Sequence, residues 1–215
     1  MSESQTKTKE DMNRAARESF SGRLLTDPQF EEAYRITSII EREIRKSGTF
    51  KDKLADYAHA FARTEKFDGV RAEMIMRDIF RERTGQTMNG LREALLEREK
   101  ALTDQERQRG YPCAEAVGPM IEKGNDAEGR RMTFHRAAAY QAQVLGRELG
   151  VTDNCAWGLM KEGFKAQRGT EFYDWGKALE QRFYTPLVEA ERQQREANAD
   201  RPQRSAPTRS GPSRS

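Results

Sequence analysis

Residues 26–48, TDPQFEEAYRITSIIEREIRKSG, carry the signals of one long helix from its first residue to its last. Thr26 can cap the N-terminus, and Pro28 stands in the first turn, where a missing amide is tolerated. Apolar residues recur at helical spacing until Gly48, a typical stop. These residues are Phe30, Ala33, Tyr34, Ile36, Ile40 and Ile44. The segment predicts an amphipathic helix, and similar patterns on both sides make the expected fold class all-α.

Other helical segments flank this one along the chain. We expect a short helix over residues 10–21 and further helices over 49–64, 68–85 and 89–102, each bounded by capping residues or glycine. In the helix over 68–85 the inward face is expected to comprise Val70, Met74, Ile75, Ile79 and Phe80. Short connections between these helices favour antiparallel neighbours in a bundle.

The positions of helical patterns and of glycine and proline divide the chain into two small helical modules, a linker and two terminal segments. Residues 1–9 are predicted to be disordered, 10–102 to form an N-terminal module, and 103–125, broken by glycine and proline, to be a linker. Residues 126–199 are expected to form a C-terminal module that opens with a long helix to about residue 149. A stripe of residues at helical spacing predicts an aromatic core for this module, and the alternative is a platform on which bases stack. Pro186 is expected to end the helix that carries the stripe. The stripe is Phe172, Trp175, Leu179 and Phe183.

The composition describes a highly charged chain without a basic excess in its body. Apolar residues make up 35% and charged residues 34% of the 215 residues, against typical values of about 45–50% and about 25%. The net charge is +3, and the segment 200–215, with four arginines and one aspartate, carries the same +3. The rest of the chain is therefore neutral, whereas a protein that binds nucleic acid usually has an excess of basic residues. The 27 arginines against 11 lysines indicate a GC-rich, bacterial genome.

Residues 142–161, AQVLGRELGVTDNCAWGLMK, resemble the pattern of a helix-turn-helix, in which two short helices surround a tight turn. The pattern requires inward apolar residues, a small residue where the helices touch and a glycine at the turn. Here these positions hold Leu145, Gly146, Leu149, Gly150, Val151, Ala156 and Leu159. The resemblance implies that Thr152 or Asp153 caps the second helix, which enters the major groove N-terminus first. It covers these residues alone, and no family is recognised over the whole chain.

The resemblance also implies a set of DNA contacts. Asn154 is expected at a base edge and the basic residues at phosphates. The full candidate set is Thr152, Asn154, Lys161, Lys165 and Arg168, with Arg130 and Arg131 in support. The alternative is an ordinary helical hairpin in which Gly150 ends the first helix, Val151 packs back on it and Trp157 belongs to the core.

The segment 200–215 is rich in proline, serine and arginine and has too few apolar residues to fold. Its arginines are Arg201, Arg204, Arg209 and Arg214. It is interpreted as a solubilising end, as an electrostatic arm for nucleic acid, or as a C-terminal address. In the last case it resembles the positively charged tails of bacterial type IV secretion substrates. The function expected from the sequence is therefore a DNA-binding accessory protein for regulation or mobile-element processing, and the alternative is a protein–protein adaptor or a secreted effector.

The chain shows no pattern typical of an enzyme. His59 and His135 lie at no metal-ligand spacing, and no phosphate-cradling glycine loop is present. Cys113 and Cys155 form no disulfide framework, and Cys113 has no neighbouring base. We therefore expect a non-enzymatic protein without cofactor or metal, with DNA or another protein as partner. A polar N-terminus and the absence of a long apolar run favour residence in the cytoplasm, away from membranes.

Overall fold

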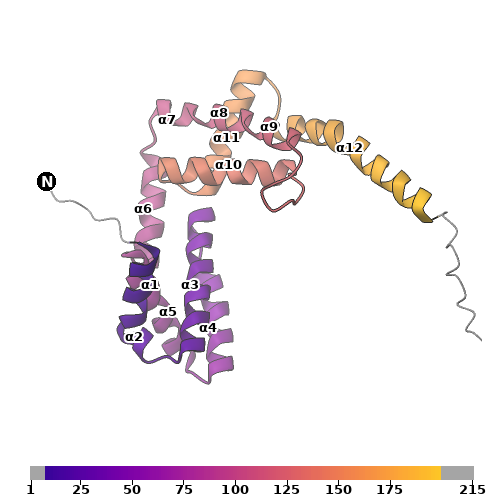
Figure 1. Ribbon diagram of the computed structural model, residues 1–215. Helices are drawn as coiled ribbons and strands as arrows, with labels where there is room; N and C mark the ends of the chain where they lie inside the picture. The colour runs from indigo at the N-terminus through magenta and orange to yellow at the C-terminus, as the bar shows by residue number, and fades with distance from the viewer. Residues whose placement is uncertain (1–7, 200–215) are drawn as a thin grey trace, which may run out of the picture.

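The computed structural model describes residues 8–199, and regular structure within this range is entirely α-helical (Figure 1). The only strand-like pairing between these residues is an isolated bridge between Asn125 and Arg131. The all-α fold class is therefore confirmed. Of the N-terminus predicted to be disordered, Thr8 and Lys9 are described, and they cap and begin the first helix. The tail over 200–215 lies outside the described residues.

The N-terminal module consists of the helices up to residue 100. They are α1 (Lys9–Glu18), α2 (Phe20–Arg23), α3 (Asp27–Ser47), α4 (Lys51–Glu65), α5 (Gly69–Thr84) and α6 (Met88–Lys100). α3 has Thr26 as its N-cap in a capping box with Gln29 and ends at Gly48, as its sequence predicts. The apolar stripe of α3 is buried against α4, α5 and α6, and this contact forms the core of the module.

Val70 and Met74 do not lie in this core, contrary to the prediction for the helix over 68–85. They are 69% and 64% exposed, whereas Ile79 and Phe80 are fully buried. The buried face of α5 comprises Ala72, Ile75, Met76, Ile79 and Phe80, against which α1, α3 and α4 pack. Helical spacing alone is compatible with burial of either of two adjacent faces of α5, and the packing of the neighbouring helices determines which face is buried.

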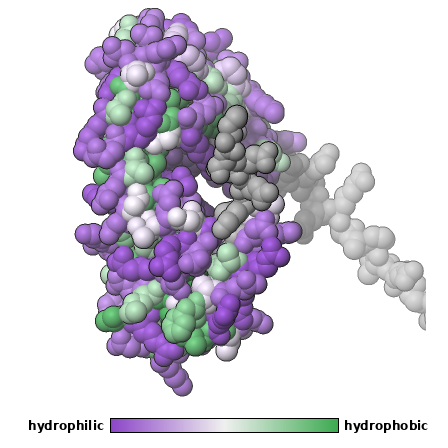
Figure 2. All heavy atoms as spheres, turned by 90° about the vertical axis from the view of Figure 1, so that its left-hand side faces the viewer, coloured by the Kyte–Doolittle hydropathy of each residue, from purple (hydrophilic) through white to green (hydrophobic). Residues whose placement is uncertain are grey.

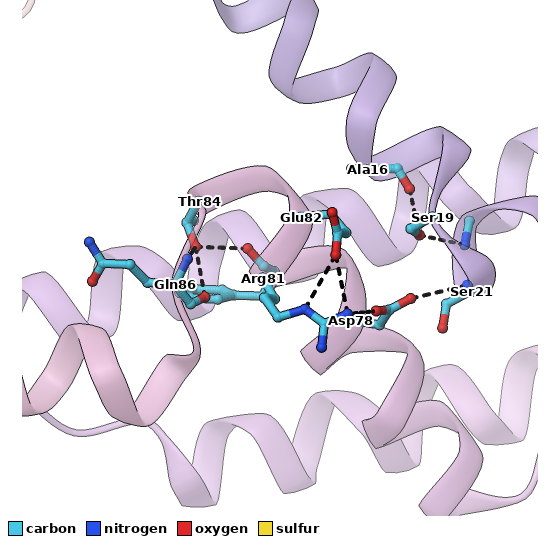
Figure 3. Close-up of polar contacts among 10 residues, drawn as sticks. Ala16, Ser19, Ser21, Asp78, Arg81, Glu82, Thr84 and Gln86 are labelled. Carbon is cyan, nitrogen blue, oxygen red and sulfur yellow. Dashed lines mark hydrogen bonds and ion pairs between the residues drawn. The ribbon is translucent and has the colours of Figure 1, made fainter. Parts of the chain in front are cut away.

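The helix expected over residues 10–21 is divided into α1 and α2 by Ser19. The Ser19 hydroxyl accepts a hydrogen bond from the Gly22 amide at 2.9 Å and so begins a new helical turn. The Ser21 amide then donates to the Asp78 carboxylate of α5 at 3.1 Å, and Arg81 donates to the same carboxylate at 2.8 Å (Figure 3). The bond from Ser21 fixes α2 against α5, and Arg81 of α5 holds the Asp78 carboxylate in place.

The predicted linker over 103–125 contains three short helices. These helices pack on the second module and do not form an extended connection. They are α7 (Asp104–Gln108), α8 (Gly110–Glu115) and α9 (Val117–Glu122). Ala114, Val117 and Ile121 are fully buried in the second apolar core. Residues 103–125 therefore belong physically to the C-terminal module.

The C-terminal module continues with α10 (Phe134–Leu149), α11 (Asp153–Arg168) and α12 (Phe172–Ala199). The long helix expected from residue 126 begins only at Phe134, because Asp126 accepts hydrogen bonds from the amides of Glu128 and Arg130 and forms a turn. α12 runs through Pro186, where a break was expected. The side chains of Thr185 and Pro186 are exposed, so water can reach the carbonyl that lacks its amide partner.

The two modules meet at the end of α6. In Figure 1 the N-terminal helices stand upright, α10 lies across their upper end with α7, α8 and α9 above it, and α12 runs outward. Each module encloses its own apolar core. The arrangement brings the start of α11 against α3 and α6, which determines what α11 can present to a partner.

Candidate nucleic-acid interface

The bend predicted within residues 142–161 is present as the turn between α10 and α11. α10 ends at Gly150, whose φ of 70° lies in the left-handed region that favours glycine. The Val151 amide donates to the Gly146 carbonyl at 2.9 Å, and a Cβ on Gly146 would lie 3.2 Å from the Val151 carbonyl oxygen. A helix-turn-helix and an ordinary hairpin share these features, so the position of α11 in the molecule must distinguish them.

The N-terminal end of α11 is enclosed by the N-terminal module. Thr152 is only 3% exposed, and its amide and hydroxyl donate to the Glu99 carboxylate of α6 at 3.1 and 2.5 Å. The Thr152 hydroxyl also accepts from the Cys155 amide at 3.2 Å and so caps α11. A helix that docks N-terminus first in the major groove needs this end in solvent. Thr152 is closed to that approach here, whereas Asn154, two residues further on, is exposed.

A polar cavity of about 540 Å³ lies beside this closed end, where α3 and α10 meet the turn. Arg42 and Arg45 of α3 line it, together with Arg147 of α10 and Asp153, the first residue of α11. Burial raises the pKa of Asp153, while the charges of Arg147 and Arg45 act in the opposite direction. Asp153, which the helix-turn-helix pattern places beside the duplex, therefore faces this cavity between the modules.

One face of α11 remains open to solvent. Asn154, Lys161 and Lys165 are exposed on it at spacings that bring helical side chains to one side. Gly158 lies between them, and a Cβ placed on it would meet no atom within 4 Å. Lys165 pairs with Glu171, and this hydrogen bond raises the pKa of Lys165. Among the residues that the structure describes, Lys161 takes part in no ion pair.

Arg168 stands at the C-terminal end of α11 and is held by α8. Its guanidinium donates to the Tyr111 hydroxyl at 3.2 Å and to the Glu115 carboxylate at 2.5 Å. The hydrogen bond between Tyr111 and Glu115 raises the pKa of Tyr111 and lowers that of Glu115. A phosphate at Arg168 would have to compete with these contacts, so its contribution to binding is expected to be smaller than that of Lys161.

Arg130 and Arg131 fasten the turn that precedes α10. Arg130 pairs with Asp126 and Glu128 within the turn itself. The Arg131 guanidinium lies 3.9 Å from the ring centroid of Tyr184 on α12 and donates to the Tyr184 carbonyl at 3.3 Å. Both side chains thus have structural contacts of their own. The tail arginines Arg201, Arg204, Arg209 and Arg214 lie outside the described residues.

A band of aromatic rings lies beside the open face of α11, in the region where the sequence favoured a core over a base-stacking platform. Trp157 is half-buried and stacks with His135 of α10, with 6.4 Å between ring centroids and planes 9° apart. His135 is exposed, and Tyr173 at the start of α12 is 49% exposed. The aromatic density of this region predicted a core, which Phe164 and Phe172 do form at 1% exposure each. Helical spacing could not reveal which rings reach the rim.

The two cysteines of the chain lie within residues 8–199, as do side chains of the other types that can bind a metal ion. No group of histidine, cysteine, aspartate and glutamate side chains there could hold a metal ion. Cys113 and Cys155 are half-buried, and burial raises the pKa of both thiols, which keeps them protonated and weakly nucleophilic. None of the helices described is both long enough and apolar enough to pass through a lipid bilayer.

Comparison of the chain with models of known protein families, with curated proteins and with solved structures finds no match. The case for any function therefore rests on the residues and their geometry.

Proposed function

We propose that this protein is a non-enzymatic accessory factor that binds DNA along the open face of α11. Lys161 and Lys165 neutralise phosphates, Asn154 reaches a base edge, and the basic tail adds unspecific attraction. Its place is the bacterial cytoplasm, in regulation or in the processing of mobile DNA. The observation that best supports the proposal is the open face itself, where exposed Asn154, Lys161 and Lys165 follow one another along a single side of a helix.

The helix lies sideways against the nucleic acid in this proposal. Thr152 is omitted from the contacts because its hydroxyl is enclosed and bound to Glu99. Arg168 contributes at the edge of the face, where it exchanges its ion pair with Glu115 for a phosphate. Arg130 and Arg131 keep a supporting role through the turn that they hold before α10.

The charge distribution predicts weak binding that depends strongly on salt. The net charge of +3 equals that of the tail, so the body attracts DNA through a local patch and not through an overall surplus. Removal of one cationic side chain that neutralises a phosphate reduces the slope of log affinity against log salt by about 1. Lys161 should therefore account for about 1 of that slope, and Lys165, which must leave Glu171 to reach a phosphate, for less than 1.

Fluorescence anisotropy with a labelled duplex at low salt tests the proposal. We expect Lys161→Ala/Lys165→Ala to weaken binding roughly tenfold, at about 0.7 kcal/mol for each lysine, and to flatten the salt dependence. The matched control is Lys51→Ala/Lys53→Ala, which removes the same charge from exposed positions on α4. The proposal fails if the intact chain binds neither this duplex nor a single strand of DNA at low salt, or if both double variants weaken binding equally.

An apolar surface on the N-terminal module favours a second candidate, a protein–protein adaptor or a secreted effector. Phe20 and Leu24 are 80% and 52% exposed, and Val70 and Met74 are 69% and 64% exposed. Phe20 lies on α2 and Leu24 at its C-terminal cap, while Val70 and Met74 lie on α5, and the bond between Ser21 and Asp78 holds α2 against α5. Figure 2 shows hydrophobic side chains gathered toward the lower end of the molecule, on the N-terminal module. Several large exposed apolar residues on adjoining helices are typical of protein interaction sites.

Truncation after Ala199 separates the two candidates. If the tail is an electrostatic arm, the truncated chain keeps its helical circular dichroism and loses DNA affinity. If the tail is an export signal, the truncated chain loses only the translocation of a fused reporter from bacteria that carry a type IV system. If the truncated chain keeps both DNA affinity and translocation, the tail is a solubilising end and has no part in either candidate function.

A further inference from the structure

We infer that the nucleic acid bound beside α11 is single-stranded, with unpaired bases stacked on the ring band of His135, Trp157 and Tyr173. This inference rests on the proposed function and specifies its ligand. The three rings form one connected surface, because His135 lies 6.4 Å from Trp157 and 5.7 Å from Tyr173 between ring centroids. The band draws on α10, α11 and α12, and it adjoins the open face of α11.

The ring band is held rigidly by buried rings beneath it. The fully buried Phe134 ring lies 6.2 Å from Trp157, 5.9 Å from Tyr173 and 5.0 Å from Phe172 between centroids. Gly176 lets α12 approach this ring so closely that a Cβ there would lie 2.1 Å from it. Rings that are already fixed lose little conformational freedom when a base stacks on them, which favours binding.

Cationic side chains stand where the phosphates of a stacked strand would pass. Lys161 follows Trp157 by one helical turn on α11, and Lys177 follows Tyr173 by one turn on α12. The Lys177 Nζ lies 5.6 Å from the Tyr173 ring centroid. One turn spans about 5.4 Å, which is within reach of the phosphate next to a stacked base. Alternation of rings and cations is the pattern of single-strand binding surfaces.

A duplex does not fit this surface equally well. Bases in a duplex stack on one another, so their faces are not available to His135 or Tyr173. Duplex reading by the tip of α11 is blocked, because Thr152 is bound to Glu99 and Asp153 faces the cavity between the modules. An unpaired strand uses both features of the face, the rings and the lysines, whereas a duplex uses only the lysines.

Anisotropy titrations of the full chain with three labelled probes test the inference. The probes are a deoxythymidylate strand of about 16 nucleotides, a mixed-sequence duplex of the same length, and a uridylate strand of that length. We expect the DNA strand to bind more tightly than the duplex. Equal or tighter binding of the duplex overturns the inference and leaves the proposed function standing. Binding of no probe overturns both. Tighter binding of the RNA strand supports the ring band and overturns the assignment to DNA.

Ring variants show whether stacking is the cause of any preference. Tyr173→Ala should weaken single-strand binding about 5- to 150-fold, the range for loss of one stacked base, and leave duplex binding unchanged. Tyr173→Leu keeps apolar volume without a ring and should weaken binding similarly, whereas Tyr173→Phe should bind as the parent chain does. Tyr140→Ala is the matched control, since Tyr140 is 56% exposed on α10. Single-strand affinity that is the same for leucine and phenylalanine at position 173 overturns the inference.

Discussion

Gly110 marks a close approach of two helix backbones, and Gly110→Ala measures how much that approach matters. A Cβ on Gly110 would lie 2.2 Å from the Leu159 carbonyl oxygen and 2.9 Å from the Met160 amide nitrogen. Ordinary contacts of a Cβ begin at 3.4 Å, so α8 and α11 would have to separate by about 1 Å. Overfilling a packed site costs about 1–3 kcal/mol. No change of rotamer can relieve a clash with backbone, so we expect about 3 kcal/mol, the upper end of that range.

Thermal unfolding followed by tryptophan emission measures the loss of stability that Gly110→Ala causes in the C-terminal module. Trp157 and Trp175, the two tryptophans of the chain, both lie in the C-terminal module. A loss of 1 kcal/mol lowers the melting temperature of a domain of about 60–100 residues by about 4–8 °C, so the expected fall is about 12–24 °C.

Gly158→Ala is the matched control for Gly110→Ala. It adds the same methyl group to α11, but at a position where no atom lies within 4 Å. The better helix propensity of alanine should raise stability there by up to about 1 kcal/mol. A melting temperature for Gly110→Ala that equals that of the parent chain would show that the two backbones are not in close contact. An equal fall in both variants would show that the effect is not steric.

Further predictions concern the contacts that hold the C-terminal module together. Hydrogen bonds from Thr103 lower the pKa of Glu106 from 4.5 to about 2, so its contribution to stability is present above pH 4.5 and is lost as the pH falls toward 2. Between pH 4.5 and about 2, Glu106→Gln should reduce the fall of the urea midpoint with falling pH. An unchanged fall would mean that other carboxylates cause it. Thr152→Val keeps the shape of the side chain but removes its bonds, and urea unfolding should show a loss of about 1–2 kcal/mol. Glu99→Gln keeps an acceptor oxygen and should lose less; a neutral Thr152→Val would mean that α6 does not secure the start of α11. Gly176→Ala pushes a methyl group into a buried phenylalanine ring and should lower the melting temperature by several degrees, and a stable variant would contradict the close packing described.

Local chemistry explains the parts of the fold that the sequence predicted well. Thr26 and Gly48 bound α3, Asp68 caps α5, and Gly150 ends α10, all as expected. Each of these signals acts within one helical turn, between a side chain and nearby amides or through the backbone conformation of a single residue. The helix class and many helix ends could therefore be predicted without knowledge of the packing.

Packing between distant segments explains the differences. Val70 satisfies helical spacing as well as Ile79 does, and only the neighbouring helices decide which of them is buried. The linker over 103–125 joins the second core because glycine at position 110 lets α8 approach α11 closely. Pro186 does not end α12, because that part of the helix is exposed and water can reach the carbonyl left without a donor.

The candidate site also has features that the local sequence predicts and features that depend on packing between distant segments. Exposure of Lys161 and Lys165 follows from the period of the helix, and it could be predicted from the apolar pattern on the opposite side. Closure of the tip of α11 could not be predicted, since Glu99 lies 53 residues before Thr152 and no local pattern links them. The exposed edges of His135 and Tyr173 were hidden for a similar reason, because a ring at helical spacing can cover a core or border it.

The outer part of α12 has a mechanical consequence. From Thr185 to Glu196 every side chain that the structure describes is exposed, and the Arg192–Glu196 pair at 2.8 Å is a purely local contact. At 1.5 Å per residue, Ala199 stands about 21 Å beyond Thr185 along the helix axis. The helix is thus a projecting arm whose exposed part is as long as roughly six base steps of a duplex. Under the proposed function, the four arginines that follow Ala199 in the sequence would extend the contact along a strand instead of strengthening it at the lysines of α11.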